Sequence, residues 1–375
     1  MSVCGKIYPK REIVKNDRAE MTAKLLANRV RRTYLGGGRI DAFTGWSRLS
    51  AAMGNQEEGT GNGEDAQMPR PEDWLASTTQ AFNGTCEIEG EGLGRLEDGR
   101  LVKDAVGGLP ILVKLLDSDE RLVIQAHPTV SCAKRLFNSP VGKTECWYFL
   151  PGTAPDACVY LGFKPGVTRE EWERAVWKNV ELWKYENVDG TTRSTCSTRL
   201  KNPLLEMLHR VPVAPGDFVF VDGGVPHAIG AGCFMVELQE PSDLMVVAER
   251  FTPSGRRIPD AKMHGGVGWG KMFDVYEYEG LDYKEACRRY VRRGCASASL
   301  REAYCICGPE FTDKFSMWHV AGGGRIDLPY DCAVAVVTDG AGSVNGIDVK
   351  KGDRLLVYGE KSADVQGGAS LLLCA

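Results

Sequence analysis

The sequence predicts a mainly β protein with inserted helices. Glycine is abundant, with 44 residues, and short apolar runs are bounded by Gly, Pro and Asp, a pattern typical of strands joined by tight turns. One long segment shows helical periodicity, and a Gly-Asp turn leading into an apolar strand occurs twice. With 375 residues and 43% hydrophobic content, the chain can bury a core and form two or three domains.

Six apolar runs predict strands in the first part of the chain: 110–116, 121–127, 145–150, 157–163, 217–222 and 232–239. From 315 to the end the alternation returns, with "DGAG" and "VNG" as turn signals. There "KKGDRLLVYG" repeats the pattern of "APGDFVFVDGG" at 214–224, which predicts two similar β-barrel units. The second unit has no histidine after its Gly-Asp strand, so it cannot reproduce a site that needs one.

A helix is expected over 168–184, where Thr168 and Glu171 form a capping box. Its apolar side chains recur at helical spacing and form a face that packs on the domain rather than a ligand platform: Trp172, Val176, Val180 and Trp183. A short second helix is expected over 202–211, with His209 as a packing or surface histidine. Residues 54–71 predict a mobile surface loop, and residues 255–300 have a mixed helical pattern.

The composition points away from nucleic-acid and membrane partners, because the net charge is only −4 and no apolar run approaches eighteen residues. The 13 cysteines are scattered without C-x-x-C pairs, which favours free thiols in a reducing compartment. The charged first twenty residues do not resemble a signal peptide. We therefore expect a cytoplasmic protein.

Four polar side chains on the predicted strands form a candidate metal site. Gln125 and His127 are two residues apart and face the same side of a strand, and Glu145 begins a later strand. His227 follows the strand 217–222 through a Gly-Gly turn. This mixed oxygen and nitrogen set suits Zn²⁺ or another divalent first-row metal. On the residues alone, His127 as a backbone-satisfied core histidine and His227 as a turn histidine remain open alternatives.

Four consecutive motifs resemble the type I mannose-6-phosphate isomerases, which are zinc-dependent cupins: "LLDSDERLVIQAHP", "GKTECWYFL", "VPVAPGDFVFVDGGVPHAIGAG" and "VELQEPSD". The similarity extends to "RTYLGG" (32–37), "PEDWLAS" (71–77) and the C-terminal β unit, and so covers nearly the whole chain. The resemblance implies a jelly-roll cupin catalytic domain over 1–250 with a helical insertion at about 165–212, a helical segment over 251–304, and a degenerate second cupin over 305–375. It implies one zinc ion per chain, held by Gln125, His127, Glu145 and His227.

The implied reaction moves a proton between two carbons of a sugar, so it needs a suitable base and a group that stabilises charge on the sugar oxygens. By resemblance, Glu237 is a pocket acid that orients the sugar or exchanges protons. Lys114 and Lys143 match pocket lysines that pair with a phosphate or with sugar oxygens. On residue type alone, either lysine could instead be an exposed strand end, and Glu237 an outward-facing charge.

Two positions depart from the family pattern. The family arginine four residues after the aspartate of the "SD" motif is Val247 here, and Arg250 lies three residues further on, on the opposite face of a regular strand. A bulge could bring Arg250 back to the site as a catalytic residue. A family serine that helps to hold the phosphate is replaced by Val123. The departures predict weaker phosphate recognition, a changed substrate or reduced activity, unless the valines only tighten an apolar wall.

The expected function is therefore interconversion of mannose 6-phosphate and fructose 6-phosphate through an enediol, by a monomer or homodimer whose partner is the small sugar phosphate. One alternative is a related cupin isomerase for a different or unphosphorylated sugar. Another is a non-catalytic, metal-binding cupin that senses sugars.

Overall fold

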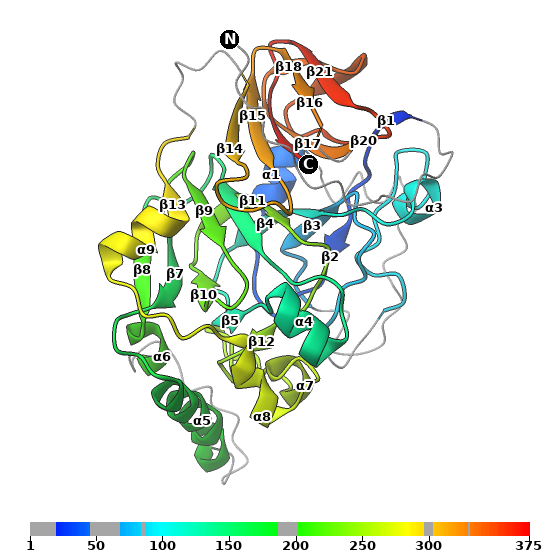
Figure 1. Cartoon of the computed structure of the whole chain (residues 1–375). Helices are drawn as coiled ribbons and strands as arrows, with labels where there is room; N and C mark the ends of the chain where they lie inside the picture. The colour runs from blue at the N-terminus through cyan, green and yellow to red at the C-terminus, as the bar shows by residue number, and fades with distance from the viewer. Residues whose placement is uncertain (1–19, 46–67, 84–87, 187–201, 296–302, 329–330) are drawn as a thin grey trace.

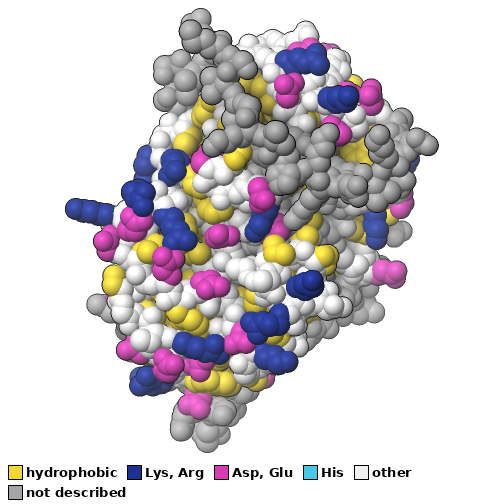
Figure 2. All heavy atoms as spheres, in the orientation of Figure 1, with side chains coloured by type: hydrophobic (Ala, Val, Ile, Leu, Met, Phe, Trp, Pro, Cys, Tyr) yellow, Lys and Arg dark blue, Asp and Glu magenta, His cyan; other side chains and the backbone are white. Residues whose placement is uncertain are grey.

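The computed structural model describes residues 20–45, 68–83, 88–186, 202–295, 303–328 and 331–375 (Figure 1). Strands dominate these ranges and form four antiparallel sheets. Most of the predicted loop 54–71 lies outside the described residues. Among those described, no helix combines the length and apolar character needed to cross a bilayer. Basic and acidic side chains are interspersed over the face drawn in Figure 2.

Two sheets form a first sandwich, called here the N-terminal sandwich. The order of the seven-stranded sheet is β13 (Val291–Arg292), β9 (Phe218–Val221), β6 (Glu145–Phe149), β11 (Cys233–Gln239), β4 (Leu112–Ser118), β3 (Glu72–Leu75) and β2 (Arg29–Val30). The order of the five-stranded sheet is β12 (Val246–Val247), β5 (Gln125–Ala126), β10 (His227–Ile229), β7 (Cys158–Phe163) and β8 (Leu208–Pro212). Apolar side chains of both sheets share one core cluster.

The other two sheets form the C-terminal β unit, drawn in orange and red in Figure 1 except for strand β1, which is blue. The order of its six-stranded sheet is β1 (Met21–Lys24), β20 (Arg354–Tyr358), β17 (Cys332–Asp339), β22 (Ser370–Cys374), β15 (Met317–Ala321) and β14 (Tyr304–Cys307). The order of its four-stranded sheet is β16 (Gly324–Asp327), β21 (Ser362–Gly367), β18 (Ala341–Val344) and β19 (Ile347–Lys350). Residues 21–24 pair with β20, so an early segment of the chain completes a C-terminal sheet.

Several strands have continuous apolar sequences because the central strands of the sheets are buried on both faces. In β17, Ala333, Ala335 and Val337 belong to the core of the C-terminal β unit, whereas the intervening Val334 and Val336 pack toward the N-terminal sandwich. Strands covered on both sides read as unbroken hydrophobic runs rather than as alternating ones.

The two Gly-Asp turns are structurally equivalent. In the first, Ala214 N donates to Asp217 Oδ2 at 3.0 Å, and Gly216 has a φ of 85°. In the second, Lys350 N donates to Asp353 Oδ2 at 3.1 Å, and Gly352 has a φ of 89°. Each turn leads into a buried strand, β9 or β20. The repeat that the sequence predicts is therefore present in the backbone.

Helices cover the outer side of the five-stranded sheet and fill the connections between strands. They are α1 (Arg39–Thr44), α3 (Val102–Val106), α4 (Val130–Phe137), α5 (Arg169–Glu186), α6 (Pro203–Glu206), α7 (Asp260–Met263), α8 (Trp269–Met272), the 3-10 helix η2 (Phe273–Val275) and α9 (Tyr283–Tyr290). The capping box of α5 forms as predicted: Thr168 N donates to Glu171 Oε2, and Glu171 N to Thr168 Oγ1. Trp172, Val176 and Val180 are buried against the sheet, and the side chain of Trp183 lies outside the described part.

Two local predictions were wrong in extent. The helix expected over 202–211 ends at Glu206, and the following residues form strand β8 with His209 inside it. Pairing with β7 supplies backbone hydrogen bonds to this segment, and Pro212 disfavours a helical residue before it. The strand expected over 121–127 is regular only at Gln125–Ala126, because β5 pairs with β10 and β12 at these positions alone.

Candidate metal centre and pocket

The two sheets of the N-terminal sandwich bring the predicted metal ligands together. His227 pairs with Gln125 across β10 and β5, and Glu145 begins β6 on the opposite sheet. One ligand atom from each of His127, Glu145 and His227 lies within 4.8 Å of the others. The amide nitrogen of Gln125 is 3.2 Å from His227 Nε2, and a flip of this amide would present its oxygen there instead.

Backbone carbonyls orient both imidazoles. His127 Nδ1 is 2.9 Å from the Leu244 carbonyl oxygen, and His227 Nδ1 is 2.9 Å from that of Val225. A proton on each Nδ1 leaves the Nε2 lone pair facing inward, the arrangement usual for metal-binding histidines. The two Nε2 atoms lie 3.2 and 3.3 Å from oxygens of Glu145. Lone pairs that converge in this way can coordinate a shared cation.

The electrostatics favour the protonation states that a metal needs. Burial and Lys143 lower the pKa of His127 to about 4, and burial lowers the pKa of His227. Burial alone would raise the pKa of Glu145, but Lys143 and the two histidines outweigh it and hold that pKa well below its usual value. Neutral imidazoles and an ionised carboxylate are the forms that coordinate metals.

The donor set fits zinc in kind and number. The three central side chains are almost fully buried, at 1% exposure or less, and neither carboxylate oxygen of Glu145 makes a hydrogen bond of good geometry within the described ranges. Two imidazoles, one carboxylate and one amide match the nitrogen and oxygen ligands of Zn²⁺, whereas Ca²⁺ takes six to eight oxygens. Lys143 Nζ reaches the same centre, 2.8 Å from Glu145 Oε2 and 2.7 Å from His127 Nε2.

Glycines allow the ligand-bearing segments to approach one another closely. Gly224 N donates to the carbonyl oxygen of His127 at 2.7 Å. A Cβ atom on the neighbouring Gly223 would lie 2.8 Å from the backbone of Thr129, and one on Gly142 would lie 2.6 Å from the carbonyl oxygen of Pro128. The Gly-Gly turn before His227 therefore allows close backbone packing. Gly142, which precedes Glu145, allows the same close packing.

Replacing Gly223 by alanine is expected to weaken both folding and zinc binding, because the new methyl group displaces the segment that carries His227. Overpacking of this kind costs about 1–3 kcal/mol of unfolding free energy. Urea unfolding and zinc titration measure the two effects. Gly108→Ala is the control, since a Cβ there meets no atom within 4 Å. Equal stability and zinc affinity of the two variants would contradict the prediction.

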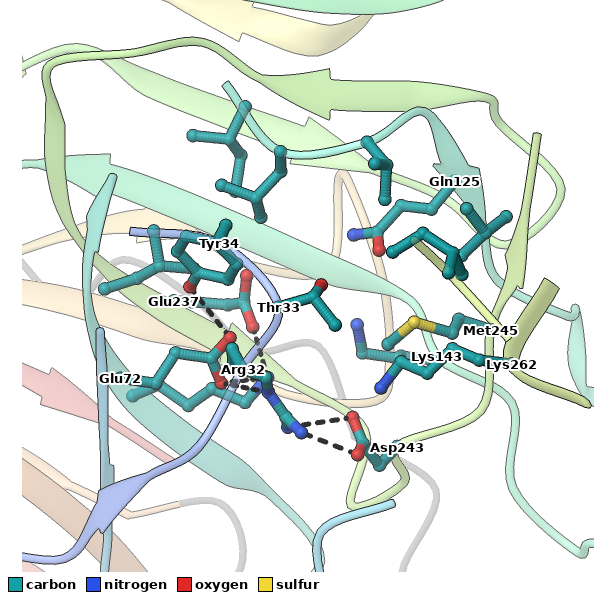
Figure 3. Close-up of a pocket in the computed structure, with 17 residues that line it drawn as sticks. Arg32, Thr33, Tyr34, Glu72, Gln125, Lys143, Glu237, Asp243, Met245 and Lys262 are labelled. Carbon is teal, nitrogen blue, oxygen red and sulfur yellow. Dashed lines mark hydrogen bonds and ion pairs between the residues drawn. The ribbon is translucent and has the colours of Figure 1, made fainter. Parts of the chain in front are cut away.

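A pocket of about 590 Å³ opens beside the metal centre (Figure 3). Gln125 and Lys143 belong to its wall as well as to the centre. Its polar walls include Arg32, Tyr34, Glu72, Lys114, Glu237, Asp243 and Lys262, and apolar side chains, among them Val123, Met245 and Val247, complete it.

Glu237 lies in a cross-strand row on the seven-stranded sheet. It is opposite Lys114 of β4 on one side and Trp147 of β6 on the other. Lys114 Nζ is 2.7 Å from Glu237 Oε1, and Trp147 Nε1 donates to Glu237 Oε2 at 3.1 Å. The strand pairing thus fixes the Glu237 carboxylate in the pocket wall.

A second charged network was not assigned from the sequence. Arg32 pairs with Glu72 at 3.1 Å and with Asp243 at 3.2 Å, and Tyr34 donates to Glu72 at 2.8 Å. Burial opposes ionisation of Glu72 and Asp243, yet Arg32 and Lys114 hold the pKa of both carboxyl groups low. These residues lie in the motifs "RTYLGG", "PEDWLAS" and "EPSD", which offered the only sequence signal for them.

The two departures from the family pattern have clear positions. Val247 pairs with Gln125 across β12 and β5, and both Val247 and Val123 line the pocket. Arg250 does not line it; its guanidinium donates to the Ile258 carbonyl oxygen at 3.0 Å and to Asp260 at 2.5 Å. The structure therefore does not bring Arg250 to the other predicted site residues.

An antiparallel β sandwich with a His-Glu-His centre between its sheets defines a cupin with a candidate metal site. In sequence, the chain is 27% identical over 274 residues to mannose-6-phosphate isomerase ManA of Bacillus subtilis, covering 70% of this chain and 74% of the relative. It is 34% identical over 134 residues to the probable mannose-6-phosphate isomerase GmuF of the same organism, covering 36% of this chain and 35% of the relative. No protein-family model matches the chain.

Solved structures agree on the fold. The mannose 6-phosphate isomerase from Bacillus subtilis superposes with a TM-score of 0.62 at 17% identity, covering 94% of this chain and 99% of that one. A zinc-bound mannose 6-phosphate isomerase gives a TM-score of 0.61 at 13% identity, covering 94% and 98%. The predicted resemblance to the type I mannose-6-phosphate isomerases and the mainly β cupin fold are confirmed.

Proposed function

We propose that the protein is an aldose–ketose isomerase that interconverts mannose 6-phosphate and fructose 6-phosphate, with one zinc ion held by Gln125, His127, Glu145 and His227. The observation that carries the proposal is the buried His-Glu-His centre opening on a pocket rich in basic side chains. The sequence relatives named mannose-6-phosphate isomerases support it.

The charge of the pocket supports a phosphorylated substrate. Its lining holds four basic side chains (Arg32, Lys114, Lys143 and Lys262) and three acidic ones (Glu72, Glu237 and Asp243), which leaves a net charge of +1. Glu145 cancels this charge, and a bound Zn²⁺ brings the whole site to +2. At neutral pH a phosphate monoester carries close to two negative charges. The loaded site and the substrate would then neutralise each other.

The groups around the centre can each supply a different part of the isomerisation chemistry. Bound zinc would act as a Lewis acid that stabilises negative charge on the sugar oxygens. Glu237, fixed by Lys114 and Trp147, is placed to orient the sugar hydroxyls or to exchange a proton with them. Lys143 provides an ammonium group beside the centre that can donate to a sugar oxygen.

A different or unphosphorylated sugar is the second candidate substrate. Val123 and Val247 form part of the pocket wall and offer no hydrogen bond to a phosphate. An apolar wall at these positions favours a less charged substrate.

A coupled isomerase assay on zinc-loaded protein, with mannose 6-phosphate and with free mannose, tests the proposal. Each reaction is repeated after chelation. Zinc-dependent turnover of mannose 6-phosphate is the expected result. Turnover of free mannose alone would favour the second candidate. If the folded, zinc-loaded protein turns over neither sugar, the proposed isomerisation of both is contradicted.

Lys262 is the residue we propose for holding the phosphate. Lys262 lines the pocket, and its ammonium group donates to the Phe82 carbonyl oxygen at 2.7 Å. It lies on α7, which contacts strand β12 with Val247. In Figure 3 its side chain reaches into the same part of the pocket as that of Lys143.

Lys262→Met is expected to lower kcat/KM for mannose 6-phosphate about 10- to 100-fold, mainly through KM, because a hydrogen bond to a charged group contributes about 1.5–3 kcal/mol. Steady-state kinetics on zinc-loaded protein measures the change. Lys271→Met on the exposed side of α8 is the control. An unchanged KM would place the phosphate elsewhere.

We further propose a cytoplasmic monomer or homodimer, organised as a catalytic cupin over 1–250, a helical connection over 251–304 and a second cupin over 305–375. The scattered cysteines support a reducing compartment: those within the described ranges are free thiols.

A further inference from the structure

A lysine of the C-terminal β unit reaches the metal-bearing end of strand β6. Lys314 lies in the connection between β14 and β15, yet its ammonium group contacts the N-terminal sandwich. Lys314 Nζ is 3.1 Å from Glu240 Oε2 and also donates to Thr144 Oγ1. Thr144 stands directly between Lys143 and Glu145 in the sequence.

The hydroxyl of Thr144 connects Lys314, through hydrogen bonds, to the segment that carries His227. Thr144 Oγ1 accepts from Lys314 and donates to Asp222 Oδ1 at 3.1 Å. The same Asp222 oxygen accepts from Gly223 N at 2.9 Å, at the start of the Gly-Gly turn before His227. One chain of hydrogen bonds therefore joins the segments of two metal ligands.

Glu240 anchors the other side of Thr144. Its Oε2 atom accepts from Thr144 N at 3.0 Å, and its backbone N–H donates to the Thr144 carbonyl oxygen at 3.1 Å. The Glu240 side chain is 2% exposed, so its carboxylate requires a cationic partner, and Lys314 supplies one. Loss of that cation would leave a buried carboxylate to be solvated by movement of the chain.

We propose that Lys314 is a positioning residue for the metal centre, through which the C-terminal β unit holds Glu145 and the His227 segment in place. The inference rests on the zinc site of the proposed function and adds a role for a unit that contributes no ligand to it. Groups that orient metal ligands typically change metal affinity 10- to 100-fold when removed.

Zinc affinity, measured by competition with a chelator, and the absorption spectrum of the Co²⁺-loaded protein test the inference without relying on activity. Lys314→Met is expected to weaken zinc binding about 10- to 100-fold and to change the cobalt spectrum. Lys314→Arg should restore much of both, since it keeps the charge. The control is Lys24→Met, which removes a similar pair with Asp353 at 2.9 Å in the C-terminal β unit.

Unchanged zinc affinity and cobalt spectrum in Lys314→Met would overturn the inference, as would equal losses in Lys24→Met. If Lys314→Met does not fold, Thr144→Val removes the bridging hydroxyl instead, and wild-type zinc affinity in that variant would equally overturn it. Failure of the wild-type protein to bind zinc would contradict the proposed metal site itself. The two failures are thus distinguishable.

Discussion

Replacing His127 by alanine is expected to abolish zinc binding and isomerase activity together. The imidazole Nε2 lies 3.2 Å from Glu145 Oε2 and is one of the three ligand atoms that converge on the centre. A metal acting as a Lewis acid provides several kcal/mol of transition-state stabilisation, so kcat/KM should fall about 10³-fold or more. Metal analysis after gel filtration and the coupled assay measure the two losses.

His209→Ala is the matched control for this experiment. His209 is also a buried histidine, and its strand β8 belongs to the same sheet as β5, but its Nε2 atom contacts the Leu281 carbonyl oxygen and not the metal centre. The His209→Ala variant should have a lower free energy of unfolding, through lost packing, but should still bind zinc. Full activity of His127→Ala, or equal zinc loss in both variants, would refute the assignment of the site.

Glu237→Gln is expected to lower kcat about 10²- to 10⁴-fold while zinc remains bound, because proton transfer by a positioned side chain contributes that much. Glutamine keeps the shape and can still accept from Trp147, but it loses the charge that Lys114 pairs with and cannot take up a proton. Single-turnover kinetics and zinc content, measured on the same preparation, separate chemistry from metal loss.

Glu249→Gln provides the comparison for the second prediction. Glu249 is a buried carboxylate that pairs with Arg121 at 2.7 Å, and it does not line the pocket. Both variants break a buried ion pair, so both should lose stability. If Glu237→Gln loses no more activity than Glu249→Gln, the role proposed for Glu237 is wrong.

The strand pattern made much of the fold predictable from sequence. Five of the six early strands appear close to their expected bounds, and the capping box of α5 and the repeated Gly-Asp turn form as expected. These features depend on neighbours in the chain: alternation within a strand, a cap three residues away, a glycine in a turn. Local chemistry is therefore sufficient to specify them.

The segment 202–211 shows where local pattern fails. Its apolar spacing suits a helix, but pairing with β7 makes the part from Leu208 onward an edge strand. Sheet pairing joins residues about fifty positions apart. The local sequence of 202–211 therefore does not indicate that strand β7 will pair with it.

By itself, the sequence predicted four candidate metal ligands, Gln125, His127, Glu145 and His227, from their places at the ends of predicted strands and from the motifs that resemble a zinc-dependent family. Only the tertiary structure decided which charges share the pocket. It placed Lys262 and Arg32 in the pocket lining, kept Arg250 out of that lining, and brought Lys314 into contact with Thr144 and Glu240. The physical reason is that an ion pair forms wherever the packed sheets bring opposite charges within a few ångströms, and that distance depends on the register of strands far apart in the chain.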